Sequence, residues 1–355
     1  MAEPIFWTSF VFIAYIYFGY PVLLILWRRL ARRTVRKAYW EPSVSLVIAA
    51  HNERDNIERK IANCLDSDYP RDRMQIIVSL DAPTDGTESL AQRYANRREV
   101  EIIYSRLRKG KVAAINAAVK KAEGQILVFG DARQRLDTNA IRELVANFQD
   151  SSVGAVTGEL ILLDENGKEA NDGIGVYWRY EKWLRAMEVE IHSMIGATGA
   201  IYAIRRELFK ELPEDTILDD VAIPLRALLA GKRTIFDPAA RAYDVECTPE
   251  MEYRRKVRTL MGNYQLLAQM PELLLPSRNP LFMQFLSHKV GRLFVPYFLA
   301  ALFLANLFLL SGFYLVFFVL QITWYFLACV GSIVSSQSHR HMPHALAVGT
   351  SEKRA

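Results

Sequence analysis

The stretch RKGKVAAINAAVKKAEGQILVFGDA, residues 108–132, decides the fold class of this 355-residue chain. Its first part has the composition of a helix over 111–122, and its second part is an apolar strand over 125–130 that stops at Asp131. The same alternation precedes it, with strands expected at 43–50, 74–80 and 100–105 and helices at 54–65 and 84–95. Strands that alternate with helices at this spacing predict an α/β fold, a mostly parallel sheet covered by helices on both faces.

Polar residues follow the predicted strands. Asn52 and Glu53 come after the first strand, Asp81 after the second and Asp131 after the fourth, while Lys111 begins the third helix. The carboxyl ends of parallel strands share one rim of the sheet, and ligands bind there. The rim therefore collects carboxylates and cations, which predicts a nucleotide-phosphate site. The chain has neither G-x-G-x-x-G nor a P-loop pattern, so a dinucleotide fold and a P-loop are not supported.

The strand end at Asp131 departs from the Asp-x-Asp pattern that often holds a nucleotide-bound metal, because Arg133 takes the second position. Arg133 could point away, leaving Asp131, diphosphate oxygens and water to hold Mg²⁺ or Mn²⁺; magnesium readily keeps several waters. Alternatively, its guanidinium could replace the charge of the metal by pairing directly with phosphate. We favour the metal, and Asp137, six residues further on, is not expected to substitute for the missing ligand.

Two uncharged runs predict membrane spans. The first, residues 5–27, is long enough to cross a bilayer. Six cations follow it, at Arg28, Arg29, Arg32, Arg33, Arg36 and Lys37. They place that end of the span in the cytosol and could also bind anionic headgroups. The second run, 293–334, divides at Ser311 and Gly312 into two spans, and the segment 281–294 suits a helix lying in the membrane interface.

These features predict four parts of the chain. They are a transmembrane helix with a basic juxtamembrane segment (1–40), a cytosolic domain (41–275), an interfacial helix with a transmembrane hairpin (276–334) and a polar cytosolic tail (335–355). The expected location is the cell membrane, inner or plasma, with several passes. Three scattered cysteines show no metal spacing and no disulfide framework. The net charge of +5 comes mainly from the juxtamembrane cluster and local patches, which favours membrane and phosphate and no nucleic acid.

The strand ends, taken in order, resemble the family 2 glycosyltransferases, which have the Rossmann-like GT-A fold. SLVIAAHNERDNIERKI (45–61), IIVSLDAPTDGT (76–87) and the stretch 108–132 are similar to the family segments that hold the base, ribose and diphosphate of a nucleotide sugar. The resemblance implies that Asp81 meets the nucleobase and that Lys111 lies near the phosphates. Asp131 would be the first aspartate of Asp-x-Asp and serve ribose or metal. Asn52 and Glu53 would border the same donor.

The stretch TILDDVAIPLRA (216–227) resembles the acidic pair that opens a helix in this family. The second acid is the catalytic base there, which implies that role for Asp220, while Asp219 would border the acceptor. An inverting transfer needs a base to take the proton of the acceptor hydroxyl. An adjacent like charge raises the pKa of one carboxyl toward useful values. The alternative is an acidic pair that caps a surface helix.

Two further segments are expected near the substrates. YRRKVRTLMGNYQLL (253–267) occupies the place of Gln-x-x-Arg-Trp in processive synthases, with Arg255 for the Gln and Thr259 for the Trp. Arg258 matches, and the resemblance implies a cation near the leaving diphosphate, with Arg255 beside the donor. The missing Trp weakens the case for processive elongation.

The second of these segments, GVYWRYEKWLRAMEVEIHSMIGATGAIYAIRRELF (175–209), resembles the helix and turn that border the acceptor and the donor sugar. Trp178 and Tyr180 would contact the acceptor, although aromatic stripes of this kind usually pack into a core. Gly199, among the small residues at 196–200, would let a sugar approach the backbone.

The resemblance implies a membrane-bound inverting glycosyltransferase. Its donor would be a nucleotide-diphosphate sugar, in particular a UDP sugar, and its acceptor a polysaccharide or a lipid-linked saccharide. Other subunits of an export complex are among the expected partners. Two alternatives stay open: a polyprenyl-phosphate sugar synthase, and a catalytically silent, nucleotide-binding subunit of a polysaccharide synthase complex.

Overall fold

The computed structural model describes residues 1–163, 169, 176–245 and 248–340, without the side chains of 176–178, 249 and 332–340. The chain divides into two compact units. One unit is Phe18–Gly291, and the other combines Met1–Tyr17 with Arg292–Ala355.

The larger unit is built on an eight-stranded sheet with the strand order β3-β2-β1-β4-β7-β6-β8-β5. The strands are β1 (Val44–Ala50), β2 (Met74–Asp81), β3 (Val100–Ser105), β4 (Ile126–Phe129), β5 (Arg135–Leu136), β6 (Val153–Leu163), β7 (Tyr202–Arg205) and β8 (Arg233–Val245). β1 is parallel to its neighbours β2 and β4, β2 is parallel to β3, and β6 is parallel to β8. By contrast, β7 is antiparallel to both β4 and β6, and β5 is antiparallel to β8. The mostly parallel α/β sheet expected from the sequence is confirmed, and the antiparallel strand in its middle was not foreseen.

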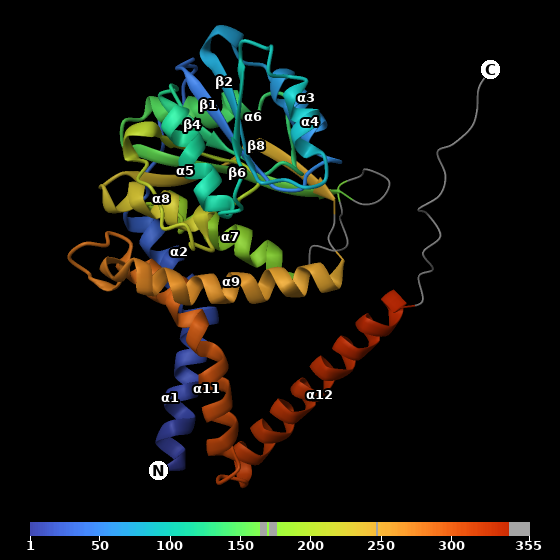
Figure 1. The fold of residues 1–355 in the computed structure, drawn as a ribbon. Helices are drawn as coiled ribbons and strands as arrows, with labels where there is room; N and C mark the ends of the chain where they lie inside the picture. The colour runs from blue at the N-terminus through green and yellow to red at the C-terminus, as the bar shows by residue number, and fades with distance from the viewer. Residues whose placement is uncertain (164–168, 170–175, 246–247, 341–355) are drawn as a thin grey trace. The chain divides into compact units, whose positions relative to one another are not determined.

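Helices cover both faces of this sheet (Figure 1). They are α3 (Ile57–Leu65), α4 (Thr87–Gln92), α5 (Lys111–Lys121), α6 (Ala140–Ala146), α7 (Val176–Ile191) and α8 (Asp219–Leu229), with short 3₁₀ helices η2 (Arg71–Arg73), η3 (Asn147–Gln149) and η4 (Arg206–Leu208). Helix α9 (Pro249–Gln269) and the 3₁₀ helix η5 (Pro271–Leu274) follow the last strand. Successive residues of a strand face opposite sides. Leu46 and Ile48 of β1 therefore pack in the core with α3 and α6, and Val47 packs in the core with α5 and α8.

Within the described residues, three helices are long and apolar enough to cross a membrane, judged by length and composition. The first, Ala2–Leu30, comprises α1 (Ala2–Ala14), the π-helix η1 (Tyr15–Gly19) and α2 (Tyr20–Leu30). The second, Phe282–Asn306, comprises α10 (Phe282–Gln284), the π-helix η6 (Phe285–Val290) and α11 (Gly291–Asn306). The third, Gly312–Gly331, lies within α12 (Gly312–Arg340). The segment expected in the interface is thus continuous with the second candidate span.

A buried polar cluster joins α7 to the ends of two of these helices within the larger unit. The hydroxyl of Tyr20 donates to Glu188 Oε1 over 2.5 Å. His288 places Nδ1 2.6 Å from the same oxygen and Nε2 3.2 Å from Glu181 Oε2. Glu188 is fully buried. Buried carboxylates need such partners, so the cluster fixes α2 and η6 against the helix between them.

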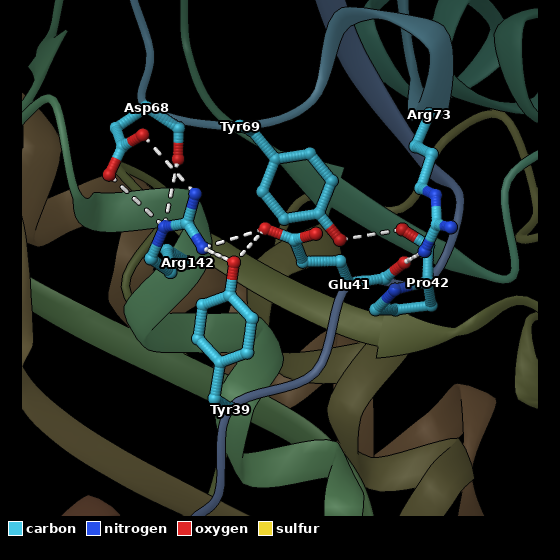
Figure 2. Close-up of polar contacts among 7 residues, drawn as sticks. All are labelled: Tyr39, Glu41, Pro42, Asp68, Tyr69, Arg73 and Arg142. Atoms are coloured by element: carbon cyan, nitrogen blue, oxygen red, sulfur yellow. Dashed lines mark hydrogen bonds and ion pairs between the residues drawn. The ribbon is translucent and has the colours of Figure 1, made fainter.

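The linker between α2 and β1, residues 31–43, is held on the surface of the larger unit by a network around Arg142 (Figure 2). The guanidinium of Arg142 donates to Glu41 Oε1 over 2.8 Å, to both carboxylate oxygens of Asp68 and to the hydroxyl of Tyr39. The hydroxyl of Tyr69 donates to the carbonyl of Pro42 over 2.5 Å. The two residues in each of these contacts lie far apart in the sequence, so the linker is part of the folded unit.

The basic residues of this region are also paired within the chain. Arg28 and Arg32 lie 2.7 and 2.9 Å from Glu190 Oε2, and Lys37 pairs with Glu143 and Asp237. Three of the six cations expected to meet headgroups therefore have carboxylate partners in the protein. Their charge is available to a membrane surface only in part.

We expect Arg142→Ala to release the linker and to expose its trypsin sites at Arg32, Arg33, Arg36 and Lys37. The loss of roughly 1–2 kcal/mol of local stability raises the open population about 5-fold to 30-fold. Limited trypsinolysis, followed by mass spectrometry of the fragments, measures the rate of cleavage.

The matched control is Arg93→Ala, which removes an exposed pair with Glu58 elsewhere on the surface. Equal linker cleavage in the two variants and the wild type would show that the Arg142 network does not hold the linker.

Candidate active site

Side chains tie the carboxyl ends of β1 and β2 together. Asn52 has a left-handed backbone (φ 52°), which asparagine tolerates better than most residues, and its Oδ1 accepts the backbone N–H of Thr84 over 2.8 Å. Glu53 accepts from the side-chain amide of Asn56 over 2.7 Å, and its backbone N–H donates to the hydroxyl of Thr87. Asn52 and Glu53 thus shape the rim at the first strand end.

Asp81 at the end of β2 anchors the loop that leads into α5. Its two carboxylate oxygens accept the backbone N–H groups of Lys109 and Gly110, each over 2.8 Å. Gly110 has a φ of 97°, a conformation that glycine adopts without strain. The carboxylate, which the resemblance assigns to the nucleobase, is buried and holds the backbone that precedes Lys111.

A cluster of one ammonium and three carboxylates forms the centre of the rim. Lys111 Nζ lies 2.9 Å from Asp131 Oδ1 and 3.1 Å from Asp219 Oδ2. A Cβ added to Gly199 would lie 3.2 Å from Asp220 Oδ2 and 3.7 Å from Asp131 Oδ2. Five of the residues expected in the site therefore lie close together: Lys111, Asp131, Gly199, Asp219 and Asp220. They come from the start of α5, the end of β4, the turn before β7 and the start of α8.

The electrostatics of the cluster set its protonation. Burial, and after it the charge of Asp219, raises the pKa of Asp220 to about 6 against the opposing effect of Lys111. Burial alone would lower the pKa of Lys111, but Asp131, Asp219 and Asp220 outweigh it and raise that pKa. Lys111 is therefore a permanent cation, while Asp220 changes charge close to neutrality.

Tyr202 is a member of the site that sequence reasoning missed. It is the first residue of β7, its ring stacks on Phe129 at 4.8 Å, and it is 1% exposed. Its buried hydroxyl has no hydrogen-bond partner among the described residues, and burial together with the nearby carboxylates raises its pKa. Its position two residues after the small-residue turn 196–200 was the available signal.

Arg133 points toward β8. Its Nη2 donates to Asp244 Oδ2 over 2.6 Å, and Gln134 Nε2 donates to the same oxygen over 2.8 Å. Asp137 accepts from the backbone N–H of Asn139 and from the hydroxyl of Tyr243.

The described residues contain no group of three or more His, Cys, Asp or Glu side chains arranged for a metal ion. A cation at Asp131 would thus need substrate oxygens and water to complete its ligands, a set that suits Mg²⁺ better than an all-protein cage does. The residues present fit a metal that arrives with the nucleotide.

Among the described side chains, three expected contact residues lie on helices α7 and α9 and not in the cluster. Arg255 and Arg258 are exposed on α9, and among the described ion pairs none joins them to the three carboxylates. Tyr180 on α7 packs beside Trp183, with ring centroids 6.2 Å apart, and the side chain of Trp178 lies outside the described part. These residues stay predictions.

α9 itself is docked near the acidic pair. A Cβ on Gly262 would meet Leu218 Cγ at 2.5 Å, and Gln265 Oε1 accepts the N–H of Ile217 over 2.8 Å. Only a glycine lets the helix come this close to the residues that precede Asp219.

Comparison with known proteins agrees with this geometry. Residues 45–213 match the model of the family described as Glycosyl transferase family 2. The chain is 24% identical over 232 residues to the probable glycosyltransferase YdaM of Bacillus subtilis, covering 62% of this chain and 55% of that protein. It is 24% identical over 236 residues to the poly-β-1,6-N-acetyl-D-glucosamine synthase of Staphylococcus aureus, covering 63% and 55%. The chain thus spans about half the length of these curated relatives.

Among solved structures, the fold is similar to that of the mannosyltransferase PcManGT from Pyrobaculum calidifontis in complex with GDP-Man and Mn²⁺. The TM-score is 0.67, the identity is 23%, and the match covers 91% of this chain and 96% of that one. The GT-A fold expected from the sequence is confirmed.

We expect Lys111→Gln to destabilise the protein more at pH 8 than at pH 5. The three carboxylates repel one another once they are ionised, and the pKa of Asp220, about 6, puts its ionisation between the two pH values. The melting temperature should fall by roughly 2–5 °C more at the higher pH. Thermal unfolding of detergent-solubilised protein measures this difference.

The control is Lys120→Gln on the same helix, where the lysine pairs with the exposed Glu211. A pH-independent effect of Lys111→Gln would mean that Lys111 does not neutralise the cluster.

Proposed function

We propose that the chain, whose residues 45–213 match the model of Glycosyl transferase family 2, is a membrane-bound inverting glycosyltransferase that uses a nucleotide-diphosphate sugar, in particular a UDP sugar. Its acceptor is a polysaccharide or a lipid-linked saccharide. The observation that carries the proposal is the meeting of Asp220, Gly199, Asp131 and Lys111 at one rim of the sheet.

Asp220 is the catalytic base. A carboxylate with a pKa of about 6 is ionised at neutral pH and is still basic enough to take a proton in the transition state. The acceptor hydroxyl attacks the anomeric carbon from the face opposite the diphosphate. The new bond joins the acceptor oxygen to that carbon, the bond from the carbon to the phosphate oxygen breaks, and the hydroxyl proton passes to Asp220.

Lys111 and Gly199 prepare the site for this exchange. The Lys111 ammonium is fixed between Asp131 and Asp219, so it is already oriented when negative charge develops on the departing diphosphate. Gly199 leaves open the space that a side chain would fill next to Asp220. Arg258 is the expected second cation. It is exposed on α9, so it would contact the diphosphate only if α9 moves closer to the carboxylate cluster or the substrate extends to α9.

A divalent cation, Mg²⁺ or Mn²⁺, is the proposed cofactor, and Asp131 would hold it together with diphosphate oxygens and water. The ion supplies positive charge to the leaving group. Two observations support it: the guanidinium of Arg133 donates to Asp244, and the similar PcManGT structure contains Mn²⁺.

The candidate membrane spans support an acceptor at the bilayer. Three helices have the length and composition of spans, and the cations after the first favour a cytosolic domain. We propose a multi-pass protein of the inner or plasma membrane. The S. aureus relative is by name a polysaccharide synthase, which supports polysaccharide assembly. Other subunits of an export complex stay a prediction.

We expect Asp220→Asn to lower sugar transfer about 10²-fold to 10⁴-fold while donor binding is retained, because the amide cannot accept the proton. The wild-type rate should fall as the pH is lowered through about 6, where Asp220 becomes protonated. Incorporation of labelled nucleotide sugars by membranes that contain the protein measures both effects.

Glu214→Gln, an exposed carboxylate a few residues upstream, is the control. Unchanged transfer by Asp220→Asn would remove the base and favour a polyprenyl-phosphate sugar synthase, whose phosphate acceptor needs no strong base. A wild-type protein that binds UDP and transfers no sugar with any donor would be the silent subunit.

We also expect chelation to abolish most of the transfer and added Mn²⁺ or Mg²⁺ to restore it, because the metal would neutralise the charge of the departing diphosphate. Rates in excess EDTA, and after back-titration with each metal, provide the measurement. Full activity after exhaustive chelation would assign the neutralising charge to cations of the protein, Arg133 among them.

A further inference from the structure

The hydroxyl of Tyr202 lies within the site but has no part in the proposed reaction. Tyr202 is 1% exposed, and its ring stacks on Phe129 with 4.8 Å between the ring centroids. Its hydroxyl has no hydrogen-bond partner among the residues that the structure describes. Burial of a polar group without a partner is unfavourable, and the O–H of a buried tyrosine usually finds one. A small polar ligand next to Tyr202 would remove this cost.

A cavity of about 10 Å³ adjoins Tyr202. Lys111, Asp131 and Asp219 line it together with Tyr202, and apolar residues of β1, β4 and α5 form much of the remaining wall. All of these residues belong to the larger unit. The volume suits a single water molecule and is too small for a sugar or a phosphate group. The positive charge of Lys111 disfavours a metal ion in the same space.

Asp219 supplies an acceptor on the wall of this cavity. Its side chain is 7% exposed, and its Oδ2 lies 3.1 Å from Lys111 Nζ. Within the described residues this oxygen accepts no hydrogen bond, so its contact with Lys111 is an ion pair without hydrogen-bond geometry. A carboxylate oxygen can accept more than one hydrogen bond. A water in the cavity would accept the O–H of Tyr202 and donate to Asp219, which gives both buried groups a partner.

The protonation of Tyr202 fits this direction of donation. Burial raises the pKa of Tyr202 well above its usual value, and the charge of Asp219 adds more to the increase than Asp220 or Asp131 does. The phenol therefore keeps its proton at neutral pH and is a hydrogen-bond donor. Asp219 has the largest electrostatic effect on it among the three carboxylates, which agrees with a short path between the two residues through the cavity.

Asp219 connects the cavity to the reacting groups. It forms an ion pair with Lys111, the cation assigned to the departing diphosphate, and it directly precedes Asp220, the proposed base. A further hydrogen bond to Asp219 restricts the rotation of its carboxylate, so the charge next to Lys111 stays in one place. Charges that are fixed in advance need no reorganisation during the reaction.

We propose that the cavity binds one water molecule and that Tyr202, acting through this water, is a positioning residue that holds Asp219 against Lys111. The effect on sugar transfer rests on the proposed function, whereas the water site does not. Tyr202 neither touches the substrate nor takes part in the proton transfer. Its role is to keep the carboxylate cluster in the arrangement that the reaction uses.

An experimental structure of the full chain that resolves ordered waters tests the site directly. We expect one water about 2.7–3.0 Å from both Tyr202 Oη and Asp219 Oδ2. In Tyr202→Phe this water should be lost or should move away from position 202. A wild-type structure without a water between the two groups would overturn the inference.

Kinetics of Tyr202→Phe test the positioning role. The variant keeps the ring that stacks on Phe129 and removes only the hydroxyl, so the fold should be retained. We expect kcat per folded molecule to fall about 3-fold to 10-fold, as the loss of one hydrogen bond does, while KM for the nucleotide sugar is unchanged.

Tyr243→Phe is the matched control, because it removes a hydroxyl that donates to another carboxylate, that of Asp137, outside the cluster. Its kcat should equal that of the wild type. An unchanged kcat in Tyr202→Phe, or an equal fall in both variants, would overturn the positioning role.

A double-mutant cycle in detergent micelles separates this inference from the proposed function, because it needs no activity. Tyr202→Phe should lower the melting temperature by about 2–4 °C in the wild type and by less in Asp219→Ala, which has lost the acceptor. Non-additive changes in a protein that transfers no sugar would keep the water-mediated contact and lose the proposed function. Additive changes in a protein whose transfer depends on Asp220 would keep the proposed function and overturn the contact.

Discussion

The ion pairs of Lys111 with Asp131 and Asp219 are the interaction on which the site depends. Three carboxylates occupy the point where a parallel strand, an antiparallel strand and two helices meet, and their mutual repulsion would drive these elements apart. One ammonium at the start of α5 makes the arrangement stable at neutral pH. It also fixes the distance between the donor side of the rim, at Asp131, and the acidic pair of α8.

Much of the fold followed from local pattern, because buried strands and amphipathic helices leave a clear periodicity. The order of the strands and helices along the chain was enough to predict that Asp131 and Lys111 share one rim. The insertion of β7 between β4 and β6 could not be foreseen, since it depends on pairing between residues such as Phe129 and Tyr202 that are far apart in sequence. Helix α4 is shorter than the expected range 84–95: it begins at Thr87, after the left-handed Gly86, and ends at Gln92.

The residues of the candidate site could likewise be predicted only in part. The charged residues that directly follow predicted strands were identified from their positions in the sequence. The resemblance to family 2 glycosyltransferases added Asp220 and Gly199. The burial of Lys60 was not foreseen, because a lysine in an amphipathic helix normally faces water, and only the packing of α3 against the segment 130–136 buries it. Arg255 and Arg258 match a motif by sequence, yet α9 holds them exposed, so their part in the reaction depends on what binds next to them.

Asp81 has a consequence for the energetics of substrate binding. By accepting two backbone N–H groups, it holds the loop before α5 in its final conformation, with Gly110 in the left-handed region and Lys111 directed to the cluster. A loop that is ordered in advance loses no conformational entropy when a ligand arrives. The affinity of a nucleotide for this rim is therefore not diminished by the cost of folding the loop around it, and the motif aspartate contributes to recognition through the preorganisation of its neighbours.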